Sequence, residues 1–283
     1  MTDNTDDNGA TRPSSPASRK VYFVSDHTGV TAEVLGHSLL ARFDHLDIET
    51  ATRPFINSRE RAAAVLEEFT KLPRPPIVFS TITDPAIREL LSTGAETHLD
   101  LFGPFIKQLE SSLGQQAATR VGAAHGIRDL GRYQARIDAV EFALTTDDGS
   151  NSKRYGSSEV IMVGVSRVGK SPTCLYLAMQ YGVRASNYPL AEDDFERSSL
   201  PAPLAPYRTK LFGLTIDPGR LHELRSKRRP HTEYASAERC AYEVRQAEQL
   251  LRRHNAPFLD VTNVSVEELA SQVLLRADLA RHR

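Results

Sequence analysis

The sequence predicts an α/β protein in which a mostly parallel N-terminal α/β domain is followed by a second α/β domain built around a glycine-rich loop. Two observations support this prediction. From Val21 onward, short apolar runs alternate with stretches whose apolar residues recur at helical spacing, which is typical of a parallel sheet covered by helices. In the second half, a glycine-rich segment at residues 164–171 stands between an apolar, β-branched run and a helical stretch. The 283 residues suffice for two modest domains or one large one.

The first half divides into a tail and a domain. Residues 1–19 are rich in Asp, Asn, Thr, Ser and Pro and show no apolar periodicity, so we expect a disordered tail. The N-terminal α/β domain is expected over residues 20–116. Its predicted strands and helices alternate in the order 21–24, 31–43, 47–55, 59–71 and 76–81. Asp84 and Pro85 are expected to open a further helix, as its N-cap and its first helical residue.

Residues 117–150 are expected to connect the two halves. They contain His125-Gly126, a helical stretch from about residue 130 to residue 144 and the turn-like Asp147-Asp148-Gly149. The second domain is expected over residues 151–283. Its predicted strands lie at residues 159–163, 210–216 and 257–261, and its predicted helices run from the loop to Gly182 and over residues 218–229, 235–254 and 266–279.

Composition limits the class of partner. The 35 basic and 36 acidic residues leave a net charge of -1, which gives no overall attraction to nucleic acid or to an anionic membrane. Cys174 and Cys240 fit no metal-binding spacing, and no secretory signal is recognisable, which favours a reducing cytoplasm. No apolar run approaches the roughly 20 residues of a membrane span. We therefore expect a soluble, cytoplasmic protein that binds neither nucleic acid nor membrane.

The glycine-rich segment matches the P-loop pattern G-x-x-x-x-G-K-[ST] at every fixed position. In this pattern the glycines let backbone N–H groups face phosphates, the lysine neutralises them and the hydroxyl binds Mg²⁺. The alternative is an ordinary glycine-containing turn, but the flanking strand and helix favour a nucleotide-binding loop. We therefore expect a P-loop kinase-like phosphotransferase domain with a catalytic Lys170. The expected nucleotide-binding residues are Gly164, Val165, Ser166, Arg167, Val168, Gly169, Lys170 and Ser171.

A carboxylate at the end of a strand usually completes the Mg²⁺ site of such a loop. Asp217 ends the apolar run at residues 211–216, so we expect it to hold the metal together with Ser171 or to act as the catalytic base. Its alternative role is the N-cap of the helix that Pro218 opens. Asp148 is a competing catalytic carboxylate, although Asp-Asp-Gly is more often a simple turn.

Four further features carry weaker hypotheses. The loop at residues 25–31 could bind an anion at a helix N-terminus, although capping by Thr28 or Thr31 is the favoured interpretation. The basic stretch at residues 220–229 could grip a phosphate or an acidic partner, although charges at a helix end are usually solvated. His125 is more often structural than catalytic. Tyr234 is expected at the start of a helix, as a cap or a ligand.

Several segments together resemble a known family, the bacterial phosphoenolpyruvate synthase regulatory proteins, which is shared with the pyruvate, phosphate dikinase regulatory proteins. The likeness covers nearly the whole chain from about Lys20. It is carried by the residues 25–33, 125–126, 147–149, 164–173, 185–189, 211–218 and 234–236, and the block from 164 to 189 is far more specific than a generic P-loop. One departure is Ser171, where threonine is common in the family, and either hydroxyl can ligate Mg²⁺.

The resemblance implies a bifunctional serine/threonine kinase and phosphorylase. Such a protein uses ADP to phosphorylate a threonine of its target dikinase, which inactivates the dikinase. It uses inorganic phosphate to remove that group, with release of pyrophosphate. It implies that residues 164–171 bind ADP. The sequence, including residues 266–270, is more similar to the phosphoenolpyruvate synthase regulators, which favours that synthase as the target over pyruvate, phosphate dikinase. The oligomeric state stays open, with a homodimer as one alternative.

Two rival functions share the loop. A P-loop kinase for a small metabolite would leave the N-terminal half of the chain without a role. A nucleotide-dependent switch would need loops that sense a γ-phosphate, and no feature of the sequence marks such loops.

Overall fold

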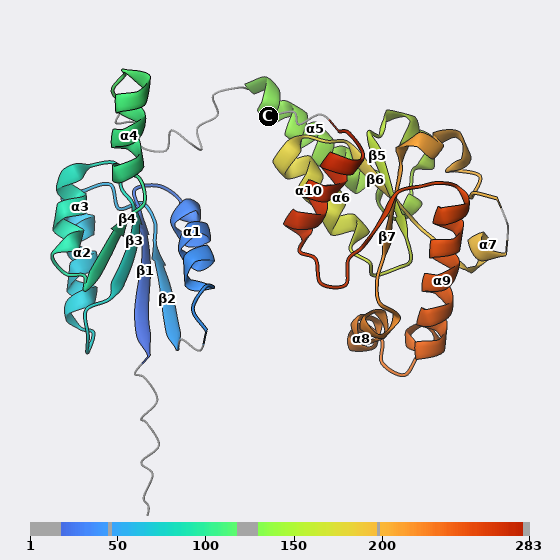
Figure 1. The fold of residues 1–283 in the computed structure, drawn as a ribbon, viewed down its shortest axis with the longest axis horizontal. Coiled ribbons are helices and arrows are strands. Elements are labelled where there is room, and N and C mark those ends of the chain that lie inside the picture. Colours follow the sequence, from blue (N-terminus) through green and yellow to red (C-terminus); the bar gives the residue numbers. More distant parts are fainter. Residues whose placement is uncertain (1–17, 45–46, 118–129, 197–198, 280–283) are drawn as a thin grey trace, which may run out of the picture. The chain divides into compact units, whose positions relative to one another are not determined.

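The computed structural model describes residues 18–44, 47–117, 130–196 and 199–279 (Figure 1). Contacts divide the chain into two compact units, residues 1–126 and 127–283, each with its own parallel sheet. Most of the expected tail (residues 1–17) and the expected His125-Gly126 lie outside the described residues. Within the described part of the chain, no helix has both the length and the apolar character that a membrane span needs.

The first unit is built on a four-stranded parallel sheet in the order β2-β1-β3-β4. Its strands are β1 (Arg19–Ser25), β2 (Ile48–Arg53), β3 (Ile77–Thr81) and β4 (Thr97–Asp100). Its helices are α1 (Val30–Leu40), α2 (Arg59–Thr70), α3 (Pro85–Ser92) and α4 (Gly103–Leu113). The sequence predicted the first three strands and the first three helices, whereas β4 and α4 are additional.

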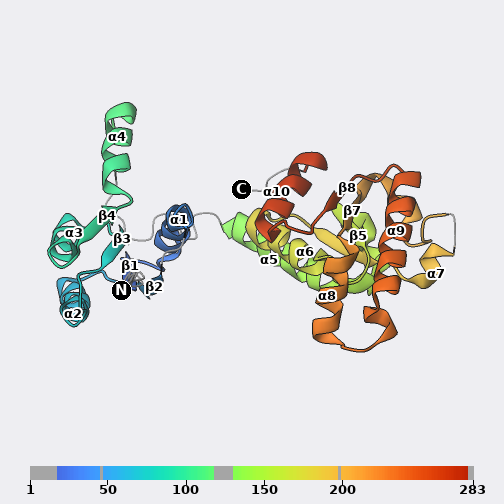
Figure 2. The ribbon, with the colours of Figure 1, turned by 60° about the horizontal axis from the view of Figure 1, so that its bottom comes forward.

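Strand β1 is buried because helices cover both faces of its sheet (Figure 2). Tyr22 and Val24 pack into a cluster with α2 and α3, whereas Phe23 packs into a second cluster on the α1 side. Helix α3 begins as the sequence predicted. Asp84 Oδ1 accepts a hydrogen bond from the amide of Ala86 at 2.8 Å, and a proline occupies the first turn.

The second unit has a parallel sheet in the order β6-β5-β7-β8. Its strands are β5 (Val160–Gly164), β6 (Ala185–Pro189), β7 (Leu211–Thr215) and β8 (Phe258–Asp260). Its helices are α5 (Leu130–Thr145), α6 (Lys170–Tyr181), α7 (Glu192–Phe195), α8 (Pro218–Arg228), α9 (Ala237–Arg253) and α10 (Val266–Arg276). Short 3₁₀ turns are η1 (Asp147–Gly149), η2 (Ser152–Ser157), η3 (Ala205–Lys210) and η4 (Glu233–Ala235). The prediction of an α/β protein with parallel sheets is confirmed.

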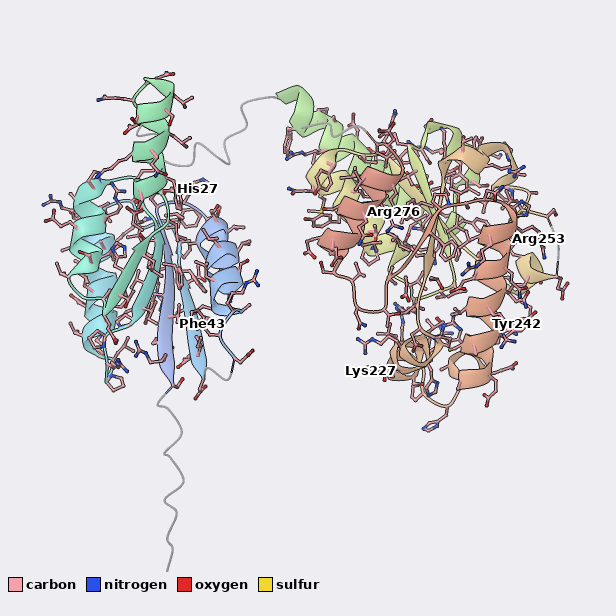
Figure 3. All side chains as sticks on the ribbon, viewed as in Figure 1. His27, Phe43, Lys227, Tyr242, Arg253 and Arg276 are labelled. Carbon is pink, nitrogen blue, oxygen red and sulfur yellow. The ribbon has the colours of Figure 1, made fainter. Side chains whose placement is uncertain are left out.

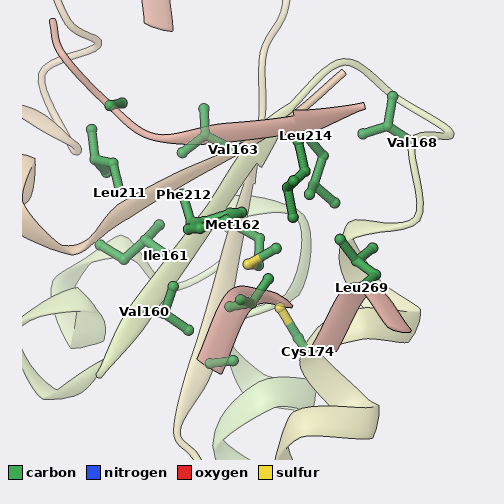
Figure 4. Packing of buried hydrophobic residues seen from close by; sticks show 14 of the residues in the cluster. Val160, Ile161, Met162, Val163, Val168, Cys174, Leu211, Phe212, Leu214 and Leu269 are labelled. Carbon is green, nitrogen blue, oxygen red and sulfur yellow. The ribbon is translucent and has the colours of Figure 1, made fainter. Parts of the chain in front are cut away.

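Helices cover both faces of this second sheet. Helices α5, α6 and α10 lie on one side, and α8 and α9 on the other (Figure 1). Helix α5, which the sequence placed in the connecting segment 117–150, packs against α6 and is part of the second unit. The close view in Figure 4 shows strand residues such as Met162 and Phe212 packed near Cys174 of α6 and Leu269 of α10.

The topology of the second sheet selects the place of a site. Strands β6 and β7 flank β5 on opposite sides, so the chain leaves β5 at a point where the order of the strands reverses. Open α/β sheets bind ligands at the carboxyl ends of their strands at such a point. The glycine-rich loop, residues 164–171, lies there, because it joins the end of β5 to the start of α6.

Candidate functional site

Two glycines shape the glycine-rich loop. A Cβ atom on Gly164 would lie 2.5 Å from the carbonyl oxygen of Leu214 on the neighbouring strand, so only glycine fits. Gly169 has a φ of 85°, in the left-handed region that favours glycine, and it precedes α6 without a side-chain cap. Arg167 also has a positive φ of 82°. The amides at the start of α6 are therefore left uncapped by side chains, as an anion-binding helix N-terminus requires.

Lys170 is the first residue of α6, and its side chain lies beneath the loop. The residue is 5% exposed, and its Nζ donates a hydrogen bond to the carbonyl oxygen of Val165 at 2.9 Å. Burial lowers the pKa of Lys170 to about 8, against the opposing effect of the nearby Asp148 carboxylate. A buried cation inside a phosphate-sized loop is stabilised by an incoming anion, so the side chain is prepared for a negatively charged ligand.

Asp147 is the carboxylate that contacts the loop. Ser171 Oγ donates a hydrogen bond to Asp147 Oδ1 at 2.6 Å, and the amide nitrogen of the buried Asn187 side chain donates to the same oxygen at 2.5 Å. Asn187 Oδ1 in turn accepts from the backbone N–H of Asp148 at 3.0 Å. The sequence chose Asp148 from this turn. The contact with Ser171 is made instead by the neighbouring Asp147, whose carboxylate is held by Asn187 of β6.

Asp148 lies beside this contact, at the edge of a cavity of about 840 Å³. Its φ is 48°, a strained value that the bond to Asn187 helps to hold. The cavity is lined by the loop and the start of α6, including Lys170 and Ser171. The end of α8, the residue after it and η4 also line it: Leu224, Lys227, Arg228, Arg229 and Tyr234. Three cations thus line the same cavity as the loop, and Figure 3 shows Lys227 on α8.

These oxygens suit Mg²⁺. The Ser171 hydroxyl and the carboxylates of Asp147 and Asp148 are hard oxygen donors placed beside the loop. Among the described residues, no group of three or more His, Cys, Asp or Glu side chains could hold a metal ion. Mg²⁺ usually takes one or two carboxylates and completes its shell with water and substrate phosphates.

Arg225 is the residue whose role the sequence missed. It was assigned to an exposed basic stretch, but its side chain is fully buried. Its Nη2 donates to the carbonyl oxygen of Ser166 at 3.2 Å and to Glu243 Oε2 at 2.7 Å. Tyr234, whose ring lies 4.2 Å below the Arg225 guanidinium carbon, donates its hydroxyl to Ser166 Oγ at 2.9 Å. Arg225 and Tyr234 therefore both hold Ser166 of the glycine-rich loop, and the hydroxyl of Tyr234 contacts the loop itself.

Asp217 takes its alternative role. Its Oδ1 accepts a hydrogen bond from the backbone N–H of Arg220 at 2.9 Å, so it is the N-cap of α8. The residue is exposed and is not among those that line the 840 Å³ cavity. The structure brings Lys170, Ser171 and Asp148 together and leaves Asp217 apart from them.

The loop after β1 is held by hydrogen bonds to the segment that follows β3. Asp26 Oδ2 accepts from the backbone N–H and the hydroxyl of Thr83 at 2.7 and 2.6 Å. The expectation that Thr28 or Thr31 caps α1 is wrong. The N-cap is Gly29, whose φ of 84° starts the helix without any side-chain hydrogen bond.

Comparisons with known proteins point in one direction. A family model described as kinase/pyrophosphorylase matches residues 21–274. A protein of Halorhodospira halophila is 49% identical over 268 residues, covering 93% of this chain and 98% of the relative. Proteins of Pseudomonas fluorescens and Laribacter hongkongensis are each 46% identical, over 267 and 271 residues, covering 93% and 94% of this chain and 98% and 99% of the relatives. All three carry the name "Putative phosphoenolpyruvate synthase regulatory protein".

Proposed function

Because this chain belongs to the kinase/pyrophosphorylase family, we propose that it is a bifunctional regulator of phosphoenolpyruvate synthase. In one direction it transfers the β-phosphate of ADP to a threonine of the synthase. In the other it uses inorganic phosphate to remove that group as pyrophosphate. The observation that carries the proposal is a single cavity in which a buried lysine, uncapped helix amides, the Ser171 hydroxyl and the Asp148 carboxylate surround space for a diphosphate, with the Asp147 carboxylate bonded to that hydroxyl.

Each group in the cavity has a role in phosphate binding. The amides of the glycine-rich loop and Lys170 Nζ bind the two phosphates of ADP. Ser171 and Asp147 would hold Mg²⁺, and when bound this ion would neutralise charge on the phosphate oxygens. Lys227, Arg228 and Arg229 also line the cavity, where they offset the charge of a phosphorylated protein segment.

Phosphorylation is a direct transfer of the β-phosphate from ADP to the threonine oxygen. The threonine oxygen forms a bond to the β-phosphorus of ADP, and the bond from that phosphorus to the bridging oxygen breaks, so AMP leaves with the bridging oxygen on its α-phosphate. The hydroxyl proton passes to the Asp148 carboxylate, which lines the cavity and is exposed to the incoming group. The loop and Lys170 stabilise charge that develops between the two phosphate positions.

The reverse reaction uses the same two positions. Inorganic phosphate lies where the α-phosphate of ADP lay, and one of its oxygens attacks the phosphorus of the phosphothreonine. The bond from that phosphorus to the threonine oxygen breaks, and the threonine oxygen takes a proton that Asp148 has accepted from the attacking inorganic phosphate. The pyrophosphate that forms overlays the diphosphate of ADP. One glycine-rich loop therefore serves both directions.

The target and the donor are tested by one assay. The names of the three relatives favour phosphoenolpyruvate synthase, and the resemblance of the sequence leaves pyruvate, phosphate dikinase as the alternative target. The purified chain is incubated with either dikinase and with ADP or ATP, and phosphothreonine is measured by mass spectrometry. We expect phosphothreonine on the synthase with ADP. Transfer from ATP alone, or to neither dikinase, would overturn the proposal.

The affinity for ADP is expected to fall as pH rises above about 8. The pKa of Lys170 is lowered to about 8, so its ammonium is charged below that pH and is progressively lost above it. Calorimetric titration with ADP without added magnesium, between about pH 7 and pH 9.5, measures the effect. Lys170→Arg is the control, because arginine stays charged throughout this range. Equal pH dependence in both proteins would show that another group titrates.

Asp217→Asn is expected to leave turnover within about twofold of the wild type, since asparagine caps a helix about as well as aspartate. The carboxylate is occupied by the amide of Arg220 and lies outside the cavity lining. Steady-state rates of both reactions measure the effect. A loss of turnover by orders of magnitude, with ADP affinity unchanged, would instead restore Asp217 as the metal ligand or the base that the sequence suggested.

A further inference from the structure

A second, smaller cavity of about 240 Å³ adjoins the phosphate-binding cavity. The two share four lining residues: Arg167, Gly169, Pro172 and Leu224. This volume lies below the range of about 300–1,000 Å³ that encloses a whole drug-sized ligand, so the smaller cavity suits one part of a larger molecule. A ligand whose phosphates lie on the glycine-rich loop can therefore extend past Gly169 and Pro172 into it.

Its walls are mostly apolar; the hydroxyls of Thr173 and Thr262 also line it, and they donate hydrogen bonds to the Gly169 carbonyl oxygen and to Asp260. Val168, Ile216 and Leu269 are its buried residues. The half-buried Val261 and Val264 come from the segment between β8 and α10, and Val266 begins α10. Arg167 and Arg220 are the charged side chains among the described residues that line it, and none of those residues is Asp or Glu. The cavity can therefore make apolar contacts with both faces of a flat group. Its two arginines supply positive charge for the phosphates of the same ligand.

We propose that this cavity binds the adenine base of ADP, an assignment that rests on the proposed function. Adenine presents apolar faces and only one exocyclic amino group. Guanine would also bury N1–H and N2–H₂ donors, for which the lining supplies no carboxylate acceptor, and buried donors without partners weaken binding. Adenine is therefore favoured over guanine.

The assignment separates the two reactions. ADP occupies both cavities, whereas inorganic phosphate and pyrophosphate have no base and occupy only the larger one. Contacts in the smaller cavity therefore contribute to the affinity for ADP and contribute nothing to the affinity for pyrophosphate. AMP keeps the base, so the same contacts contribute to its affinity as well.

Val264→Gln tests the assignment, since it replaces an apolar wall by a longer polar side chain that would crowd the base and be left without a partner. We expect calorimetry to give about tenfold weaker binding of ADP, with the affinity for pyrophosphate unchanged. The wild type should bind ADP more tightly than GDP, and the variant should narrow that preference. Leu275→Gln is the matched control, because Leu275 lies on α10, is 81% exposed and does not line the cavity.

Each outcome decides the matter. Unchanged ADP affinity in Val264→Gln, or equal weakening of ADP and pyrophosphate, would overturn the base site while leaving the proposed function intact. Failure of the wild type to bind either ligand would overturn the proposed function itself. If Val264→Gln does not fold, Val264→Thr keeps the shape of valine and replaces one methyl group by a hydroxyl, and it should weaken ADP binding selectively in the same direction.

Discussion

Replacing Lys170 by methionine is expected to abolish both phosphorylation of the synthase and its reversal, with turnover falling by about a hundredfold to a thousandfold in each direction. The Lys170 ammonium contacts the loop, with Nζ 2.9 Å from the Val165 carbonyl oxygen. From there it can interact with negative charge on either phosphate. Methionine keeps an unbranched side chain, one atom shorter, and removes its charge. Lys170→Ala should give the same loss, although it also leaves a void.

The control for this prediction is Lys153→Met, which removes an exposed lysine that does not line the cavity. Thermal unfolding checks that each variant is folded, since removing a buried charge is not expected to destabilise the protein. A Lys170→Met protein that is folded, lacks kinase activity and keeps its phosphorylase activity would show that inorganic phosphate binds elsewhere. The loop after β1 would then be the next candidate.

Asp147→Asn should have the second-largest effect. Asp147 Oδ1 accepts from Ser171 Oγ and from Asn187 Nδ2, so this carboxylate fixes the hydroxyl of the loop and would share Mg²⁺ with it. Asparagine keeps one oxygen acceptor and loses the charge. We expect turnover to fall by about tenfold to a hundredfold, with a higher Mg²⁺ concentration needed for half-maximal rate.

Asp138→Asn is the matched control, because Asp138 is an exposed carboxylate on α5 that bonds only to the neighbouring Gln134 among the contacts described. The measurement is the rate of both reactions against Mg²⁺ concentration. An unchanged Mg²⁺ dependence in Asp147→Asn, together with a shifted one in Asp148→Asn, would move the metal from Asp147 to its neighbour.

Much of the fold could be predicted because periodicity and local signals agree with it. The buried run of β1 and the Asp84-Pro85 start of α3 are examples, as is Gly182, whose φ of 70° ends α6. Strand β6 was missed, since Ser186 and Asn187 are polar and Pro189 is unusual in a strand. Ser186 and Asn187 are nevertheless buried, because they form hydrogen bonds to residues far away in the sequence. Ser186 Oγ bonds to Ser158 Oγ, and Asn187 bonds to Asp147.

The same limit applies to the site. The glycine-rich loop could be found because its residues are adjacent, but the carboxylate beside Ser171 could not be chosen between two neighbouring aspartates. Asn187 decides that choice by bonding both to the side chain of Asp147 and to the backbone of Asp148. Arg225 was misjudged for a similar reason. Its basic neighbours are exposed, and only the packing of α8 against α9 buries it beside Glu243.

The central claim is that one glycine-rich loop serves both directions, and the inhibition of the phosphorylase reaction by ADP tests it most directly. Initial rates of dephosphorylation of the phosphorylated synthase are measured against inorganic phosphate at several fixed concentrations of ADP. Competitive inhibition is predicted, with an unchanged maximal rate and an apparent KM for phosphate that rises linearly with ADP. A maximal rate that falls with ADP at constant KM would place phosphate and ADP at separate sites and would contradict the claim.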